Sequence, residues 1–276
     1  MATATGTQGQ TEELLAAVVD LAQQKWSDRL VAAYALGSLA HGGFCPLVSD
    51  VDIGFVLSDP ILGTDGEVVS QLVASIKAGN RPFSDRLSVF WGSAASLSGA
   101  AQGGRFPPLD RLDLLKYGRL LAGSDVRSKL PLPTRKELVL VGAEFALWRL
   151  ANDEVTEKLK HPHALARSDP KTLTKLILYP VRFMFTARTG EVGRNEAAVD
   201  HFVAATSGAP SRLASLALKW RNAAPERSDE SATQAIAEGV LPLYHEFLLD
   251  HERRLREYER PDLADAFQQW RQRLQA

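Results

Sequence analysis

The sequence predicts an α+β protein, in which an N-terminal mixed sheet flanked by helices is followed by an all-helical C-terminal bundle. Short apolar runs rich in β-branched and aromatic residues lie in the first half of the chain and have the length of buried strands. From residue 135 onward, the apolar residues instead recur at helical spacing. Pro131 and Pro133 stand between the two patterns and mark an inter-domain hinge. We therefore expect two domains, residues 1–134 and 135–276.

The N-terminal domain is expected to alternate helices and strands. Thr11 has the side chain of an N-cap, and the acidic and apolar residues after it predict a helix that runs to about Trp26. A buried strand then ends at Gly37, and a second strand starts at Asp50. Residues 93–108 are rich in Gly, Ala and Ser, which predicts a surface loop with one short helix. The strands are expected at residues 30–36, 51–57 and 86–91, an extended piece at 119–121, and further helices at 67–78 and 110–116.

The C-terminal domain is expected to be helical almost throughout. Phe247, Tyr258 and Trp270 fall within apolar stripes and are expected in the core of the bundle. His161 and His163 flank a proline and are expected in a polar linker rather than at a metal site. The predicted helices are residues 138–150, 173–188, 195–205, 212–220, 231–255 and 263–274.

The composition argues against several classes of function. Of the 276 residues, 45% are hydrophobic and 24% are charged, which is typical of a globular protein with a substantial core. The 32 basic and 33 acidic residues give a net charge of −1, so sequence-independent binding to nucleic acid is not expected. Cys45 is the single cysteine, and no apolar run approaches the ~20 residues of a membrane helix. We expect a cytoplasmic protein without a membrane partner.

The residues that carry chemistry lie between the first two predicted strands. Gly37 and Ser38 follow the first strand, and after eleven further residues Asp50 and Asp52 begin the second. Residues two apart on a strand point to the same face, so these carboxylates repel each other unless a divalent cation lies between them. Glycine lets a phosphate group approach the backbone, and the Ser38 hydroxyl can donate to phosphate oxygens. The competing interpretation is an ordinary α/β domain in which Gly37 and Ser38 cap a helix.

This arrangement resembles the signature of the nucleotidyltransferase superfamily related to DNA polymerase β. In that signature an apolar residue and Gly-Ser precede an Asp-apolar-Asp strand by roughly ten residues. The resemblance implies that Asp50 and Asp52 are catalytic carboxylates that hold Mg²⁺, and that Gly37 and Ser38 bind the nucleotide. It makes a nucleoside triphosphate the expected partner, with ATP as substrate and Mg²⁺ as cofactor.

A second resemblance concerns the helical half. Residues 182–192, together with 195–199, are similar to the helix-turn-helix pattern in the C-terminal bundle of aminoglycoside adenylyltransferases. Residues 118–125 are similar to the segment that closes the catalytic domain of those enzymes. Their bundle supplies basic contacts to the nucleotide phosphates, and the matching position here is Arg182. The alternative interpretation of Arg182 is a cation on a helix surface.

One position departs from the superfamily pattern. These enzymes generally carry a third carboxylate on the neighbouring strand, as a second metal ligand or as the base that activates the acceptor hydroxyl. Here Ser88 stands where that carboxylate is expected. Asp85, three residues earlier, substitutes as base if the strand begins with a bulge or turn, and is otherwise a turn residue at the strand start. Asp113 is interpreted as a charge on a helix surface.

The sequence thus predicts a nucleotidyltransferase that transfers a nucleoside monophosphate, AMP from Mg-ATP, to a hydroxyl of a small molecule such as an aminoglycoside-like antibiotic. Ser88 keeps a second possibility open, a non-catalytic nucleotide-binding homologue that acts as a sensor or an antitoxin-like partner. A third is an enzyme that transfers AMP to a protein. The acceptor itself is left open, because the sequence does not show which carboxylates converge to bind a cationic substrate.

Overall fold

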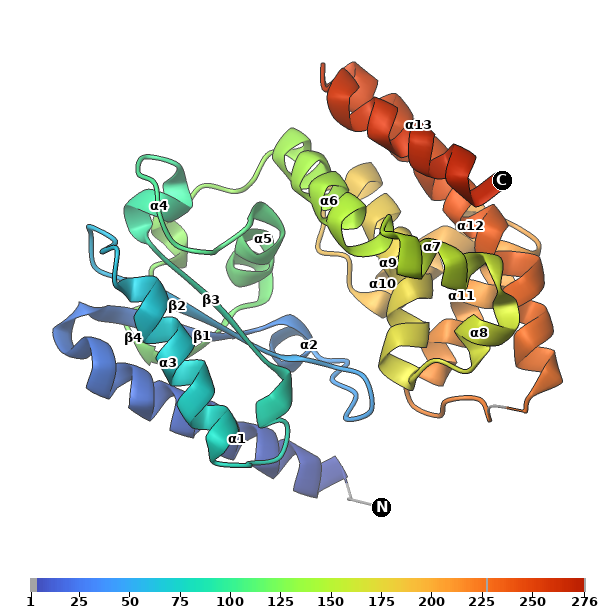
Figure 1. The fold of residues 1–276 in the computed structure, drawn as a ribbon. Helices are drawn as coiled ribbons and strands as arrows, with labels where there is room; N and C mark the ends of the chain where they lie inside the picture. Colours follow the sequence, from blue (N-terminus) through green and yellow to red (C-terminus); the bar gives the residue numbers. More distant parts are fainter. Residues whose placement is uncertain (1–3, 227, 276) are drawn as a thin grey trace. The chain divides into compact units, whose positions relative to one another are not determined.

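The computed structural model describes residues 4–226 and 228–275. The chain divides into two compact units that meet in sequence between Pro133 and Thr134. Each unit is described below by itself, and Figure 1 shows the elements of both in chain order.

The N-terminal unit contains a four-stranded mixed sheet in the order β3-β2-β1-β4. Strand β1 runs antiparallel to both β2 and β4, whereas β2 and β3 are parallel. The strands are β1 (Leu30–Leu36), β2 (Val51–Leu57), β3 (Leu87–Ser93) and β4 (Arg119–Gly123). The predicted mixed sheet is confirmed, and the short extended piece expected at 119–121 is the edge strand β4.

Helices cover both faces of this sheet. Alternate residues of β2, such as Ile53 and Phe55, pack with α1 and α3 in one hydrophobic cluster. Val56 belongs to a second cluster on the opposite face, which includes Leu97 of α4 and Leu114 of α5 (Figure 1). This period of two is the alternation that a strand imposes. The helices of the unit are α1 (Ala4–Trp26), α2 (Gly37–His41), α3 (Asp65–Ala78), α4 (Ala94–Ser98) and α5 (Pro108–Tyr117).

The beginning of α1 differs from the sequence prediction. The helix begins at Ala4 rather than at Thr11. Thr11 is only 1% exposed, and its hydroxyl donates to the carbonyl of Gln8, one helical turn earlier, at 2.9 Å. The prediction of Thr11 as an N-cap was therefore wrong, because a threonine hydroxyl can equally bond a carbonyl of the preceding turn inside a helix.

The C-terminal unit is helical throughout its regular elements, as predicted. Helix α9 packs against α6, α10, α11 and α12 and so forms the centre of the unit. Its helices are α6 (Arg135–Leu150), α7 (Asp153–Lys160), α8 (Pro162–Ala166), α9 (Pro170–Thr189), α10 (Asn195–Ala205), α11 (Ala209–Trp220), α12 (Glu230–Glu257) and α13 (Pro261–Gln275). The polar linker expected around His161 and His163 is instead the junction of two short helices.

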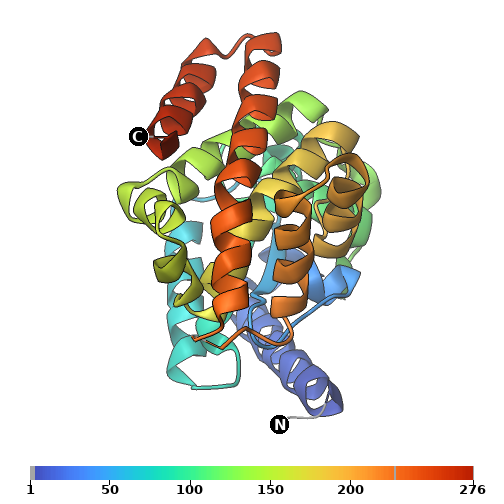
Figure 2. The ribbon, with the colours of Figure 1, turned by 90° about the vertical axis from the view of Figure 1, so that its right-hand side faces the viewer.

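An aromatic core holds the end of the helical unit together. Helix α13 folds back beside the C-terminal half of α12 (Figure 2). Phe247 and Trp270 are buried between them, as predicted, whereas Tyr258 ends α12 in a half-buried position. The Tyr244 hydroxyl donates to the carbonyl of Leu176 at 2.8 Å, which ties α12 to α9. No helix in the described part of the chain has both the length and the apolar character needed to cross a membrane.

Candidate active site

Gly37 forms a tight turn between β1 and α2. Its φ of +60° lies in the left-handed region, which favours glycine over residues with a side chain. A Cβ atom placed on Gly37 would lie 2.4 Å from Oδ2 of Asp52, far inside van der Waals contact. The register of the sheet explains this approach, since Leu36 pairs with Asp52. Because Gly37 has no side chain, the Asp52 carboxylate can lie against the turn.

Asp52 points away from the face of the sheet that carries α1 and α3. Val51 and Ile53, its neighbours in β2, are fully buried on that face, so strand alternation directs Asp52 to the opposite one. Asp50 immediately precedes the strand, and both aspartates are half-buried. The Gly37-Ser38 turn and the two aspartates thus meet at one end of the β1–β2 pair.

The neighbouring strand places Ser88 directly beside Asp52. The two residues are partners in the parallel register of β2 and β3, and Ser88 is half-buried. Asp85 lies in a 3₁₀ turn, Ser84–Arg86, just before β3. Its side chain is 81% exposed, and its carboxylate is 4.0 Å from Nε of Arg86. The structure therefore brings Ser88 next to Asp52 and leaves the carboxylate of Asp85 on an exposed turn.

A third carboxylate, which sequence reasoning missed, reaches the same turn. Asp113 on α5 is buried, and its Oδ2 accepts a hydrogen bond from the backbone N–H of Gly37 at 2.5 Å. The prediction that Asp113 is a charge on a helix surface was therefore wrong. Helix α5 buries four consecutive residues, Arg111 to Leu114, so it has no single apolar face that would have separated buried from exposed positions in the sequence.

The two aspartates are the kind of ligands that would fit a metal bound together with a phosphate group. Within residues 4–226 and 228–275, no three His, Cys, Asp or Glu side chains are grouped so that they could hold a metal ion. Asp50 and Asp52 nevertheless provide hard carboxylate oxygens at the start of β2, beside a turn whose glycine lets the Asp52 carboxylate approach the backbone. Mg²⁺ is commonly bound by one or two carboxylates together with substrate phosphates and water, rather than by an all-protein cage.

In the helical unit, Arg182 lies half-buried on α9. Its Nε donates to the carbonyl of Gly193 at 2.5 Å, and its guanidinium carbon lies 5.8 Å from the ring centre of Tyr179. The bond to Gly193 connects α9 to the segment before α10, whereas Tyr179 lies on α9 itself. Neither terminal guanidinium nitrogen of Arg182 makes a hydrogen bond to another described residue.

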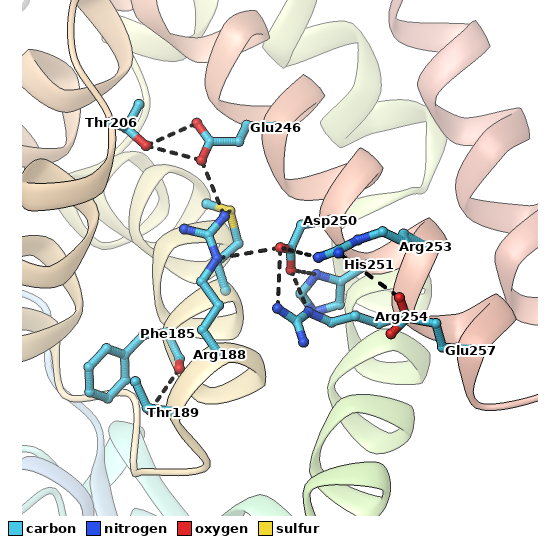
Figure 3. Close-up of polar contacts among 11 residues, drawn as sticks. Phe185, Arg188, Thr189, Thr206, Glu246, Asp250, His251, Arg253, Arg254 and Glu257 are labelled. Atoms are coloured by element: carbon cyan, nitrogen blue, oxygen red, sulfur yellow. Dashed lines mark hydrogen bonds and ion pairs between the residues drawn. The ribbon is translucent and has the colours of Figure 1, made fainter.

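A network of charged residues secures α9 against α12 (Figure 3). Arg188 on α9 is 3.3 Å from Glu246 and 3.4 Å from Asp250, both of α12. Arg254 donates to Asp250 at 2.9 Å, and the Thr206 hydroxyl after α10 donates to Glu246 at 3.0 Å. These contacts connect α12 to α9 and to the residue that follows α10.

Burial and charge shift two pKa values in this network. Burial acts to raise the pKa of the Asp250 carboxyl, but the hydrogen bond from Arg254 and the nearby positive charges outweigh it, so that pKa is lowered. His251, next in the chain, is 1% exposed and packed between Phe247 and Phe267. Burial lowers the pKa of His251 to about 4, so the imidazole is neutral at pH 7.

Comparison with known proteins supports the fold. The sequence matches no protein-family profile and no curated protein. The structure is similar to that of the spectinomycin adenyltransferase AAD(9) from Enterococcus faecialis, solved with ATP and spectinomycin. The TM-score is 0.57 and the sequence identity 15%, and the match covers 82% of this chain and 96% of the other. The predicted fold class, an N-terminal mixed sheet flanked by helices followed by a helical unit, is thereby confirmed.

Proposed function

We propose that this protein is a nucleotidyltransferase that transfers AMP from Mg-ATP to a hydroxyl of a small molecule. One observation carries the proposal: Gly37 is pressed against the carboxylate of Asp52 at the end of β1. The antiparallel register of β1 and β2 brings the turn at Gly37 and Ser38 together with Asp50 and Asp52, although eleven residues separate Ser38 from Asp50. The similarity to an adenyltransferase fold supports the same assignment.

The two aspartates, the Gly37-Ser38 turn and Arg182 have separate roles in this proposal. Asp50 and Asp52 would hold Mg²⁺, which when bound would offset the charge that develops at the α-phosphorus. Gly37 lets the Asp52 carboxylate lie against the turn on which the triphosphate would bind, and the Ser38 hydroxyl would donate to a phosphate oxygen. Arg182 would supply a guanidinium to the phosphates, since its two terminal nitrogens are not used by other described residues.

The reaction joins the acceptor oxygen to the α-phosphorus and breaks the bond between that phosphorus and the bridging oxygen, so pyrophosphate leaves. The hydroxyl proton must pass to a base. We propose Asp85 for this role, as the carboxylate closest in sequence to Ser88. Its side chain is 81% exposed on the turn before β3 and can therefore reorient.

The proposed acceptor is an aminoglycoside-like compound. The similar structure was solved with spectinomycin, which makes this class of small molecule the first to test. A cationic acceptor would be bound by carboxylates through charge-assisted hydrogen bonds.

A second candidate function rests on Ser88. Because a serine stands opposite Asp52 in the register, the position beside the proposed metal site has a hydroxyl in place of a carboxylate. A hydroxyl is a poor base and a weak metal ligand, and general-base catalysis typically contributes ~100-fold to ~10,000-fold. The chain would then bind Mg-ATP and turn over little or nothing, as a sensor or partner protein does.

Pyrophosphate release separates the two functions. We expect release from ATP with at least one acceptor in a panel of aminoglycosides, lincosamides and protein extracts, and we expect Asp85→Ala to abolish it. Activity unchanged in Asp85→Ala would exclude Asp85 as the base. A silent wild type that gains activity in Ser88→Glu would favour the non-catalytic function, because the new carboxylate would stand beside Asp52.

A further inference from the structure

Helix α5 holds the short helix α2 at both of its ends. At the first residue of α2, the carboxylate of Asp113 accepts the N–H of Gly37. At the last residue, Nε2 of His41 lies 4.0 Å from Oδ1 of the same Asp113. The ring of Tyr117 meets the His41 ring edge-on, with 5.6 Å between the ring centres. Three side chains thus fix the turn that begins at Gly37.

The contacts with α2 come from one face of α5. Asp113 and Tyr117 are four residues apart, so they lie on one face of the helix, one turn from each other. The side chains of Asp113 and His41 are 9% and 8% exposed, so both contacts are largely shielded from water. A buried hydrogen bond from an N–H to a carboxylate is roughly twice as strong as one between neutral groups.

The same glycine contacts both carboxylates. Its N–H meets Oδ2 of Asp113, and the open side of its Cα meets Oδ2 of Asp52. Covalent geometry therefore limits the separation of these two oxygens to about 7.5 Å. A shift of Gly37 away from Asp113 would also change how the turn meets Asp52.

We infer that Asp113 is a positioning residue for the nucleotide: it fixes the backbone of Gly37 so that the turn bearing Ser38 stays against Asp52. This inference rests on the proposed function, because the turn is the part of the chain assigned to the triphosphate. His41 and Tyr117 secure the other end of α2. Asp113 acts through Gly37 and does not itself touch the nucleotide.

Two variants and one control test the inference. Asp113→Ala removes the acceptor, and Asp113→Asn keeps a neutral oxygen that can accept a weaker bond. Asp20→Asn is the matched control, because Asp20 is an exposed carboxylate on α1 of the same unit. Circular dichroism establishes that each variant is folded. Hydrogen exchange of the Gly37 amide, without nucleotide, reports the contact itself, and calorimetry reports the affinity for Mg-ATP.

We expect Asp113→Ala to lower the protection of the Gly37 amide and to weaken Mg-ATP binding by about 10-fold or more, the scale of a lost hydrogen bond to a charged group. Asp113→Asn should keep part of the Gly37 amide protection and part of the Mg-ATP affinity, and Asp20→Asn should change neither quantity. If Asp113→Ala does not fold, the comparison is made with Asp113→Asn. A weaker affinity of Asp113→Asn than of Asp20→Asn for Mg-ATP supports the inference, and equal affinities for Mg-ATP overturn it.

Three other results would overturn it. Equal or tighter Mg-ATP binding by folded Asp113→Ala would show that the carboxylate does not position the turn for nucleotide. Unchanged protection of the Gly37 amide would show that the contact does not hold the turn. Absence of Mg-ATP binding by the wild type would remove the proposed function, and this inference with it. The first two results leave the proposed function standing, so the failures are distinguishable.

Discussion

Replacing Gly37 with alanine should damage the site through a single added atom. The new Cβ would lie 2.4 Å from Oδ2 of Asp52, whereas ordinary contacts of this kind are 3.4–4 Å. The Asp52 carboxylate would therefore have to move by about 1 Å, since the turn itself is held by the backbone. If Asp52 holds Mg²⁺ as proposed, a displacement of this size should lower the rate by roughly 100-fold.

The variant also has a conformational penalty that must be separated from this displacement. Alanine in the left-handed region is destabilised by roughly 1–2 kcal/mol relative to its preferred conformations. Gly99, at the end of α4, offers a matched control, because its φ of +82° and ψ of 3° lie in the left-handed region and a Cβ there meets nothing within 4 Å. Gly37→Ala and Gly99→Ala should both lose about 1–2 kcal/mol of stability, but only Gly37→Ala should lose function.

The assay combines urea unfolding with calorimetry of Mg-ATP and, where an acceptor is found, pyrophosphate release. We expect Gly99→Ala to bind Mg-ATP as the wild type does, and Gly37→Ala to bind it far more weakly. If Gly37→Ala binds Mg-ATP with wild-type affinity, the contact between Gly37 and Asp52 is irrelevant to the site, and the reasoning that assigns both residues to it is refuted.

Three further predictions concern the helical unit. The pKa of His251 is about 4 in the folded protein and 6.5 in the unfolded chain, so between these pH values only the unfolded chain takes up the proton. As the pH falls through this range, the free energy of unfolding should therefore decrease by up to about 1.4 kcal/mol per pH unit. His251→Phe should flatten that slope in urea unfolding, and an identical slope would contradict the assignment. Arg182→Ala should weaken Mg-ATP binding about 10-fold, whereas the exposed control Arg212→Ala should not, and equal affinities would remove Arg182 from the site. Asp250→Ala should lower the free energy of unfolding by about 3 kcal/mol, because Arg188 and Arg254 lose their buried partner; a loss no larger than that of exposed Glu238→Ala would count against the network.

The strands and most helices could be predicted because their signals are local. The apolar run before Gly37 and the run after Asp50 have strand length and clear ends, and the structure begins and ends β1 and β2 there. The start of α1 was missed because residues 4–10 contain two glycines and otherwise small or polar side chains, which have low or moderate helix propensity and no apolar stripe. Extension of a helix beyond such a segment depends on its surroundings.

The candidate site was only partly predictable for a related reason. Gly37, Ser38, Asp50 and Asp52 lie within sixteen residues, so their spacing is visible in the sequence. Asp113 reaches Gly37 across 76 residues, and Arg188 reaches Asp250 across 62. Pairings of this kind are set by how helices pack, and a single charged residue in a helix carries no mark of its distant partner.

Calorimetry of ATP with and without divalent cation tests the central claim most directly. The account predicts that the wild type binds ATP with Mg²⁺ and loses that affinity in EDTA, because Asp50 and Asp52 then repel the phosphates. The double variant Asp50→Asn with Asp52→Asn should lose Mg-ATP binding, while the matched double variant Asp20→Asn with Asp28→Asn, two exposed positions, should keep it. Equal affinity for ATP in Mg²⁺ and in EDTA, or in the wild type and the Asp50/Asp52 variant, would contradict the account.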